Sequence, residues 1–369
     1  MDPDKKYTTI HYHKYLELDK LLDAQKTRSG QFEDKSAHEE LLFIIVHQVY
    51  ELWFKQIIHE VTSVCDMFRS DEVDERSLGV AVGRLDRVEE ILKLTIQQIS
   101  VLETMTPLDF LDFRNYLFPA SGFQSYQFRI IESMLGLREE DRMTYNGHSY
   151  KIVFTEDQQA ILTDVEQRGS LFELIENWLE RIPFLDYKEF NFLDSYSKAV
   201  ENMLHKEQKA IEETDYLSDK MKAMRLKMLG GSNTYFKHVL SKEAHDEMRA
   251  SGEIKLSYKA TISALLIKLY RDHPILQMPY RLITNLTDID ELLTTWRYRH
   301  AQMVKRMIGN KVGTGGSSGH DYLVQTAEKH KIFNDFHNIS SLLIPRSELP
   351  DLPEKMVKEL GFYYTDQNS

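Results

Sequence analysis

The sequence predicts an all-α protein built around a bundle of helices. Apolar residues recur at intervals of three and four through most of the 369-residue chain, which is the spacing of helices with one buried face. Alternation of apolar and polar residues, which marks a half-buried strand, never continues for more than a few residues. The sequence has no internal repeat and no heptad run, so neither a solenoid nor a long coiled coil is expected.

Composition and charge narrow the classes of function. The chain has 42% hydrophobic and 28% charged residues, which fits a soluble globular protein of one large or two modest domains. Its formal net charge of −12 argues against binding to nucleic acid or to an anionic membrane, because both require a basic face. No apolar run is expected to span a bilayer. The single cysteine, Cys65, and the lack of a signal-peptide pattern predict a cytoplasmic protein.

The N-terminal region is expected to form an arm. Residues 1–10 are polar, and residues 11–25 have the spacing of a short amphipathic helix with Tyr12 and Tyr15 at its entry. A loop is expected at residues 30–35. Such a segment has little core of its own to bury.

The next helix is predicted to be buried on several sides. Ser36 and Glu39 have the spacing of a capping box that would start it. The helix then stays apolar almost all round to about residue 58. His47 lies one turn after Phe43, so its imidazole is expected inside the protein.

An arginine among phenylalanines marks the following segment. A helix is expected from about Val80 to Glu103, and Pro107 interrupts the pattern before a shorter helix at residues 108–117. This shorter helix places four residues on neighbouring turns of one face: Phe110, Phe113, Arg114 and Leu117. Arg114 pairs with a carboxylate such as Glu103 in one interpretation, and its guanidinium fork binds a substrate carboxylate in the other.

The middle of the chain has a different composition. Residues 143–251 combine helical spacing with many charged residues, which indicates a solvated helical insertion. The aromatic stretch 183–192 is expected to dock this insertion on the core. The predicted organisation is therefore an arm at 1–35, a core formed by 36–142 and 252–345, the insertion 143–251, and a tail at 346–369.

The last core helix carries a histidine within its apolar stripe. A Pro-containing link is expected at 273–279, and the helix is expected to begin near Leu286. Its apolar face holds six residues: Ile289, Leu293, Trp296, Met303, Val304 and Met307. His300 lies in the middle of this stripe, so burial favours its neutral form. A neutral imidazole beside an apolar cavity suits haem iron, although this helix alone favours a core histidine bonded to a carbonyl or carboxylate.

Searches for common catalytic motifs leave one glycine loop. The patterns H-E-x-x-H, C-x-x-C and G-x-S-x-G do not occur, so zinc, iron–sulfur and serine-hydrolase chemistry have no support. Residues 313–319 read Gly-Thr-Gly-Gly-Ser-Ser-Gly, but they follow a helix, and Lys311 precedes them where a P-loop lysine would follow. The loop is interpreted either as a close approach to a ligand, with the Thr314 hydroxyl, or as a flexible end of the helix.

Several of these motifs, in this order, resemble the tryptophan 2,3-dioxygenase family. The resemblance covers most of the chain and rests on Tyr12-His-Lys-Tyr-Leu, His38-Glu-Glu-Leu-Leu-Phe-Ile-Ile-Val-His-Gln, Glu51-Leu-Trp-Phe-Lys, Glu103-Thr-Met-Thr-Pro, Phe113-Arg, Ser121-Gly-Phe-Gln-Ser, Trp296-Arg-Tyr-Arg-His and Gly313-Thr-Gly-Gly-Ser-Ser-Gly. The long acidic insertion resembles the animal-type members more than the shorter bacterial ones.

The resemblance implies a helical homotetramer with haem b in each subunit. By this resemblance His300 is the axial ligand of the iron, and His47 accepts a hydrogen bond from the indole N–H of L-tryptophan. Further residues acquire implied roles in the same way: Phe43, Phe110 and Leu117 as walls of the indole pocket, Arg114 and Thr314 as contacts of the substrate's carboxylate and ammonium, Ser121 and Gly315 as contacts of the haem, and Tyr12 and Tyr15 as residues donated to the neighbouring subunit's site.

The implied reaction is the insertion of O₂ across the indole C2–C3 bond, which gives N-formylkynurenine. It needs no protein nucleophile, and His47 is expected to orient the indole because the indole N–H is barely acidic. The sequence departs from the family at two positions. Phe110 replaces a tyrosine that some members use near the carboxylate, so Arg114 carries more of that contact. Leu41 replaces a second histidine, and no loss of chemistry is expected from it.

Two other functions are compatible with parts of this pattern. A monooxygenase of the same family would share every motif and would differ only in releasing an oxindole. A haem-based gas sensor or a helical scaffold would have no need of Arg114 and Thr314, so this pair favours an enzyme that binds an amino acid.

Overall fold

The computed structural model describes residues 9–144, 149–188, 190–311 and 319–361. Over these residues the chain is helical apart from one two-stranded sheet, so the predicted all-α class is confirmed. The α-helices are α1 (Tyr12–Tyr15), α2 (Leu18–Leu22), α3 (His38–Phe68), α4 (Glu75–Leu102), α5 (Pro107–Leu117), α6 (Tyr126–Leu135), α7 (Glu156–Gln167), α8 (Leu171–Leu179), α9 (Phe192–Glu213), α10 (Asp219–Leu240), α11 (Lys242–Ala250), α12 (Tyr258–Leu269), α13 (Pro274–Ile308), α14 (His320–Lys329), α15 (Asn334–Asn338) and α16 (Glu354–Leu360).

Shorter elements connect these helices. The 3₁₀ helices are η2 (Ser29–Gln31), η3 (Gly122–Gln124), η4 (Glu139–Asp141), η5 (Tyr150–Val153), η6 (Pro183–Leu185), η7 (Ile339–Leu342) and η8 (Arg346–Glu348). The sheet pairs β1 (Asp186–Tyr187) with β2 (Phe190–Asn191) in antiparallel register. Phe184, Tyr187 and Phe190 pack against the main hydrophobic core, as expected for an aromatic segment that docks its neighbours on the core.

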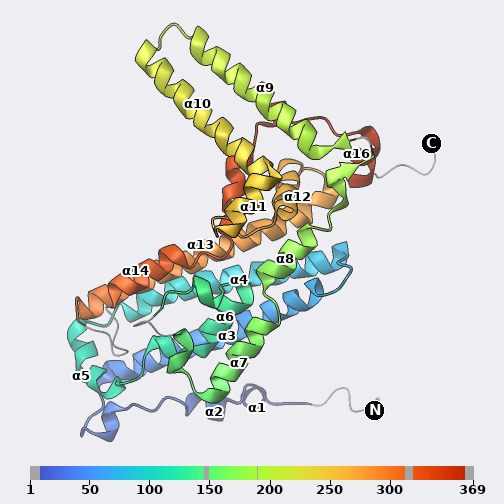
Figure 1. The fold of residues 1–369 in the computed structure, drawn as a ribbon. Helices are drawn as coiled ribbons and strands as arrows, with labels where there is room; N and C mark the ends of the chain where they lie inside the picture. Colours follow the sequence, from blue (N-terminus) through green and yellow to red (C-terminus); the bar gives the residue numbers. More distant parts are fainter. Residues whose placement is uncertain (1–8, 145–148, 189, 312–318, 362–369) are drawn as a thin grey trace.

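Long helices form the body of the molecule. Helix α4 packs along both α3 and α13, with α6 against α3 and α14 against α13 (Figure 1). Their facing residues are almost fully buried, including Val64, Leu85, Ile289 and Leu293. Burial of such side chains contributes about 1.5–3 kcal/mol each, so this contact dominates the stability of the bundle.

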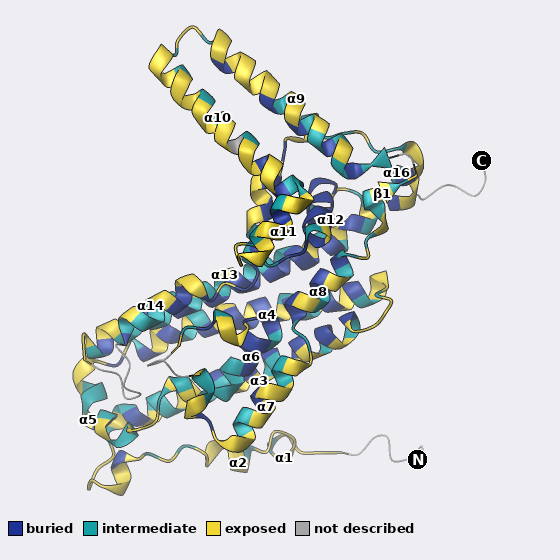
Figure 2. Ribbon diagram, in the orientation of Figure 1, coloured by how far each residue is buried: buried dark blue, intermediate teal, exposed yellow. Residues whose placement is uncertain are grey.

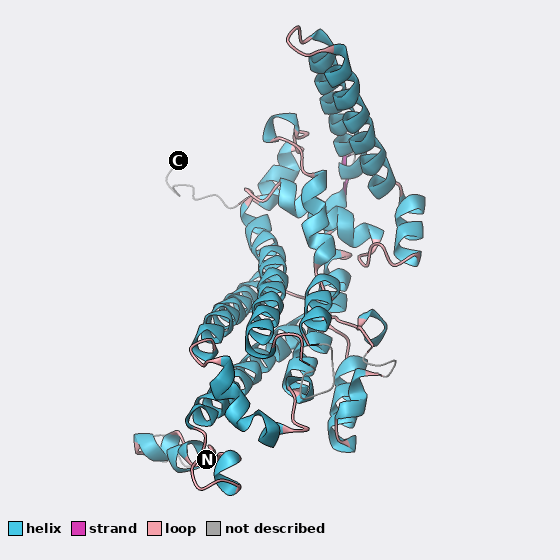
Figure 3. Ribbon diagram, turned by 90° about the vertical axis from the view of Figure 1, so that its left-hand side faces the viewer, coloured by secondary structure: helices cyan, strands magenta, loops and turns pink. Residues whose placement is uncertain are grey.

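Helices α9 and α10 form a hairpin that projects away from this body, and most of its surface is exposed (Figures 2 and 3). In contrast, α7 packs on α6, and α8 packs on α3 and α12. The predicted insertion therefore contains both a projecting hairpin and helices that cover the core. Its boundaries at 143 and 251 remain a prediction.

The start of α13 differs from the sequence-based prediction. Residues 274–279 are helical, so the expected link before Leu286 is wrong. Pro274 occupies the first helical position, where its missing N–H costs nothing. Pro279 lies inside the helix and removes one backbone hydrogen bond, but it is buried in the core. The helix therefore carries His300 on a rigid element of 35 residues.

The start of α3 also differs. Ala37 is the N-cap and no side chain caps the helix, so the predicted capping box of Ser36 and Glu39 is wrong. The buried carboxylate of Glu40 instead accepts hydrogen bonds from the backbone N–H groups of Arg28 and Ser29 at 2.6 and 2.9 Å. It holds the preceding loop against the first turn of the helix.

The boundaries of the next two helices come from side-chain caps. Helix α4 begins at Glu75, five residues before the predicted start, because Asp74 accepts a hydrogen bond from the Ser77 N–H at 2.7 Å. Helix α5 begins at Pro107, where Thr106 and Asp109 form a capping box.

Helix α3 has the length and composition of a membrane span, with a mean hydropathy of 1.3 over its most apolar window. The expectation that no apolar run reaches this length is therefore wrong for α3. The core helix of a soluble protein passes the same test, and α3 packs in the bundle against α4 and α6.

The first part of the N-terminal arm, α1 and α2, buries none of its residues. The predicted single helix is divided into α1 and α2 by Glu17, which adopts a φ of 51°. Neither helix has a buried residue, and Tyr12 and Tyr15 are each 70% exposed.

Candidate active site

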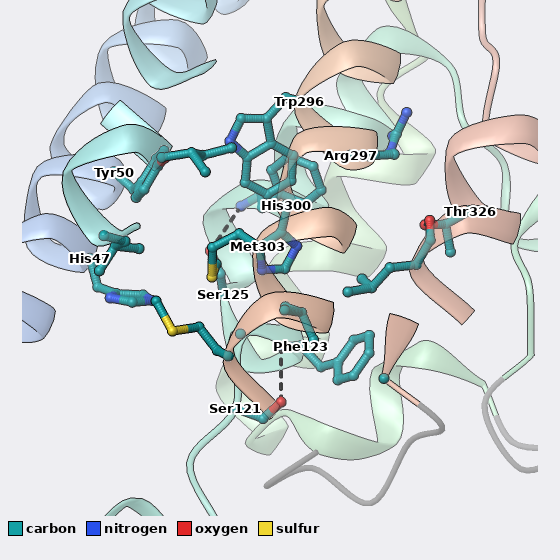
Figure 4. Close-up of a pocket in the computed structure, with 18 of the residues that line it drawn as sticks. His47, Tyr50, Ser121, Phe123, Ser125, Trp296, Arg297, His300, Met303 and Thr326 are labelled. Carbon is teal, nitrogen blue, oxygen red and sulfur yellow. Dashed lines mark hydrogen bonds between the residues drawn. The ribbon is translucent and has the colours of Figure 1, made fainter. Parts of the chain in front are cut away.

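One cavity of about 290 Å³ lies between α3, α5, α6, α13 and α14. Aromatic and aliphatic side chains form most of its wall, and a few polar groups face it (Figure 4). Ligand pockets in proteins are commonly of this kind, with an apolar body and a small number of placed polar groups. Its lining includes Phe43, His47, Tyr50, Phe54, Phe110, Arg114, Ser121, Phe128, Arg129, Trp296, Arg297, His300, Met303, Thr326 and His330.

Two histidines face this cavity from different helices. His47 comes from α3 and His300 from α13, and the charge of His47 influences the pKa of His300 (Figure 4). The side chain of His47 is exposed where it faces the cavity, and that of His300 is half-buried. The protein packed near both rings favours the uncharged form of an imidazole. Burial, followed by His47, lowers the pKa of His300 to about 4, and burial also lowers the pKa of His47. Both rings are therefore neutral at pH 7.

The tautomer of His47 follows from its hydrogen bond. Its Nδ1 lies 2.7 Å from the backbone carbonyl of Phe43. A carbonyl oxygen only accepts hydrogen bonds, so Nδ1 carries the proton and Nε2 keeps its lone pair. The Phe43 ring packs on the imidazole at a centroid distance of 4.1 Å and fixes its plane. His47 therefore offers an oriented acceptor to a ligand in the cavity.

His300 is held differently. Neither ring nitrogen has a hydrogen-bond partner among the residues that the structure describes, and the Trp296 ring stacks on the imidazole at 5.3 Å and 14°. A neutral imidazole with no protein partner can donate its lone pair to a metal. Within the described part of the chain, no group of three or more His, Cys, Asp or Glu side chains could hold a metal ion.

The cluster around Phe113 forms one end of the cavity. Phe110 lies 5.9 Å from Phe43 and 5.3 Å from Phe113 between ring centroids. Leu117 packs on the same cluster without lining the cavity, so the structure places it behind the wall.

Arg114 also lines the cavity. Glu103, one carboxylate that Arg114 was expected to pair with, instead forms an ion pair with Arg299 at 3.0 Å. Ser121 lines the cavity as the N-cap of η3, where its Oγ accepts a hydrogen bond from the Phe123 N–H at 3.4 Å (Figure 4).

The remaining predicted site residues do not meet the cavity in this chain. Thr314 and Gly315 lie outside the described residues. Tyr12 and Tyr15 are exposed and do not line it. A role for these tyrosines in a site requires another copy of the chain.

With this geometry established, comparison with known proteins is informative. The model of the tryptophan 2,3-dioxygenase family matches residues 3–343. The chain is 51% identical to tryptophan 2,3-dioxygenase of Bdellovibrio bacteriovorus, over 97% of this chain and 100% of that protein. It is 47% identical to tryptophan 2,3-dioxygenase of Dictyostelium discoideum, over 96% of this chain and 89% of that protein. The corresponding values for tryptophan 2,3-dioxygenase B of Danio rerio are 44%, 96% and 86%.

The chain belongs to the tryptophan 2,3-dioxygenase family. The predicted resemblance is confirmed, and it extends over nearly the whole chain. The full-length match to a bacterial protein shows that the segment 143–251 is not confined to the animal members of the family.

The structure adds a buried charge cluster that the sequence-based predictions missed. Glu132 of α6 accepts hydrogen bonds from three guanidiniums: Arg129 at 2.8 Å, Arg142 at 2.5 Å and Arg297 at 2.8 Å. These arginines hold the pKa of Glu132 well below its usual range, against the effect of burial. The cluster joins residues 129, 132, 142 and 297. The sequence signal for this cluster was the occurrence of charged residues among apolar ones.

We expect Glu132→Gln to lower the free energy of unfolding by about 3–5 kcal/mol, because it removes the shared partner of three buried cations. Urea denaturation monitored by circular dichroism measures this change. Glu140→Gln is the matched control, since its exposed carboxylate pairs with the exposed Arg138 at 3.3 Å, and such pairs contribute about 0–1 kcal/mol. Equal effects of the two substitutions would show that the cluster is not important for stability.

Proposed function

We propose that the protein is a haem-dependent tryptophan dioxygenase that inserts O₂ across the indole C2–C3 bond of L-tryptophan and gives N-formyl-L-kynurenine. The observation that carries the proposal is the pair of neutral imidazoles, His47 and His300, facing one apolar cavity in a member of the tryptophan 2,3-dioxygenase family. The proposed cofactor is haem b, with ferrous iron for activity.

His300 is the proposed axial ligand. Its neutral ring, the missing hydrogen-bond partners among the described residues, and the stacked Trp296 all suit coordination through a nitrogen lone pair. When bound, the haem supplies the site for O₂ and the electrons for its activation.

His47 is proposed to orient the indole. Its Nε2 accepts a hydrogen bond from the indole N–H, while Nδ1 stays bonded to the Phe43 carbonyl. A role as an obligatory base is disfavoured because the indole N–H is barely acidic. Phe43 and Phe110 exclude water and fix the plane of the ring.

Arg114 is proposed to bind the substrate carboxylate, with Thr314 near the amino-acid end. The guanidinium fork matches a carboxylate in two hydrogen bonds. Phe110 has no hydroxyl to share this contact. Ser121 and Gly315 are proposed haem contacts, and Leu117 supports the wall from behind.

We propose a cytoplasmic homotetramer whose active sites are shared between subunits. The exposed side chains of Tyr12 and Tyr15 and the absence of buried residues in α1 and α2 support a segment that packs on a neighbouring copy.

The central test is the substitution of His300. We expect purified His300→Ala to lose stoichiometric haem, because no described residue replaces the axial nitrogen, whereas His47→Ala keeps its haem. Haem content and the ferrous spectrum measure both effects. Retention of full haem with an unchanged ferrous spectrum in His300→Ala would exclude the axial assignment.

Product analysis tests the reaction on the same preparations. Wild type reduced anaerobically with tryptophan and then exposed to O₂ is expected to yield a product with the mass of N-formylkynurenine. The mass of an oxindole would instead identify a monooxygenase.

A second prediction concerns Arg114. Truncating one partner of a buried charge pair costs about 2–5 kcal/mol, so Arg114→Ala is expected to lower kcat/KM for tryptophan by about 30-fold to several thousand-fold. Tryptamine lacks the carboxylate, so wild type discriminates strongly against it and Arg114→Ala loses most of that discrimination. Arg114→Lys should restore activity only partly, because lysine lacks the fork. An unchanged ratio between the two substrates would make Arg114 a structural residue.

A third prediction concerns the arm. Deletion of residues 1–20 is expected to raise the KM for tryptophan and to weaken the oligomer at the same time, because both depend on the same contact. Steady-state kinetics and light scattering measure the two effects. A truncated protein with normal size and normal KM would contradict the shared site.

A further inference from the structure

The cavity has a second cationic wall, apart from Arg114. It is formed by Arg129 of α6 and Arg297 of α13, with Glu132 between them. Arg297 lies three residues before His300 on the same helix, so the two side chains are neighbours on one face of α13 (Figure 4). This wall is therefore adjacent to the proposed axial ligand.

Among the buried groups of this wall the charges do not balance. Arg129, Arg142 and Arg297 share the single carboxylate of Glu132, which leaves a formal excess of two positive charges. Asp290 is the other buried carboxylate near Arg297, and its oxygens already accept the N–H groups of Ile332 and Phe333 at 2.9 and 3.3 Å. The excess remains positive when Asp290 is counted. Buried charge of one sign is costly unless an opposite charge accompanies it.

Arg129 is the member of the cluster that can accept a ligand. Its side chain is 14% exposed, against 3% for Arg142 and 4% for Arg297, and it lines the cavity. One of its N–H groups donates to Glu132, and no other hydrogen bond joins its guanidinium to the described residues. A guanidinium has five N–H donors in a planar fork. The contact with Glu132 fixes the plane while donors remain for a second carboxylate.

The neighbouring histidine contributes no charge to this balance. The Met143 N–H donates to Nε2 of His330 at 3.1 Å, so that nitrogen is unprotonated, and burial lowers the pKa of the ring. The ligand that the wall requires is therefore an anion, and the apolar remainder of the cavity requires that this anion be attached to a large apolar body.

We propose that Arg129, positioned by Glu132 and supported by the charge of Arg297, binds a propionate carboxylate of the haem. The proposal rests on the proposed function, since it takes haem as the cofactor. Haem meets both requirements, with a flat apolar macrocycle and carboxylates on one edge. The contact fixes the rotation of the macrocycle about the axial bond to His300.

Comparison of haem with haem dimethyl ester tests this contact by equilibrium binding to the haem-free full-length chain. The ester keeps the macrocycle and iron but has no carboxylate. A charge-assisted contact contributes about 10- to 100-fold in affinity, so wild type is expected to prefer haem by at least that factor. Arg129→Met should remove most of this preference, and Arg129→Lys should keep part of it. Arg138→Met, at a half-exposed arginine outside the cavity, should keep it all.

Each outcome has one meaning. The same preference for haem in Arg129→Met and in wild type would overturn the proposal. Loss of the preference in Arg114→Met, with Arg129→Met unchanged, would assign the carboxylate to Arg114. An increased Kd for tryptophan in Arg129→Met, with an unchanged preference for haem, would place the substrate carboxylate at Arg129.

Failure of wild type to bind either compound would overturn the proposed function itself. If Arg129→Met does not fold, the intermediate preference of Arg129→Lys decides the question.

Discussion

The contact of α13 with α4, which also packs on α3, is the constraint on which the site depends. Ile289 and Leu293 are buried in this bundle and set the rotation of α13 about its axis. Seven residues, or two turns, separate Leu293 from His300, so the histidine must face the same side as the buried leucine. The same packing presents His47 of α3 to the cavity from the facing helix. Two side chains far apart in sequence are therefore brought together by ordinary core packing.

That packing also determines the protonation of the site. Both imidazoles face the cavity, and the protein packed near them is the largest influence on each pKa. A charged imidazole would neither coordinate iron nor accept a hydrogen bond at the same nitrogen. The helix packing thus provides two uncharged imidazoles. Among the described residues, no carboxylate forms a hydrogen bond with either ring. The Phe43 carbonyl alone selects the tautomer of His47.

The helical class and the two histidines were predictable because an apolar stripe specifies which residues of a helix face inward. Predictions failed where a polar side chain or backbone group had more than one possible partner. Ser36 and Glu39 have the spacing of a cap, but the buried Glu40 takes the backbone donors of the preceding loop. Glu103 was an available partner for Arg114, but Arg299 of another helix reaches it. Pro274 and Pro279 suggested a link, although proline is compatible with the start of a helix. Tyr12 and Tyr15 depend on a second copy, which no single-chain pattern contains.

The chain carries a net charge of −12, and this value says nothing about a local cluster of positive charge. Inside the bundle a single carboxylate, Glu132, holds three guanidiniums in place. Because Arg297 and His300 belong to one continuous helix, the positive charge and the His300 imidazole keep a fixed separation. The rigidity of α13 therefore fixes this charge relative to the cavity that both histidines face.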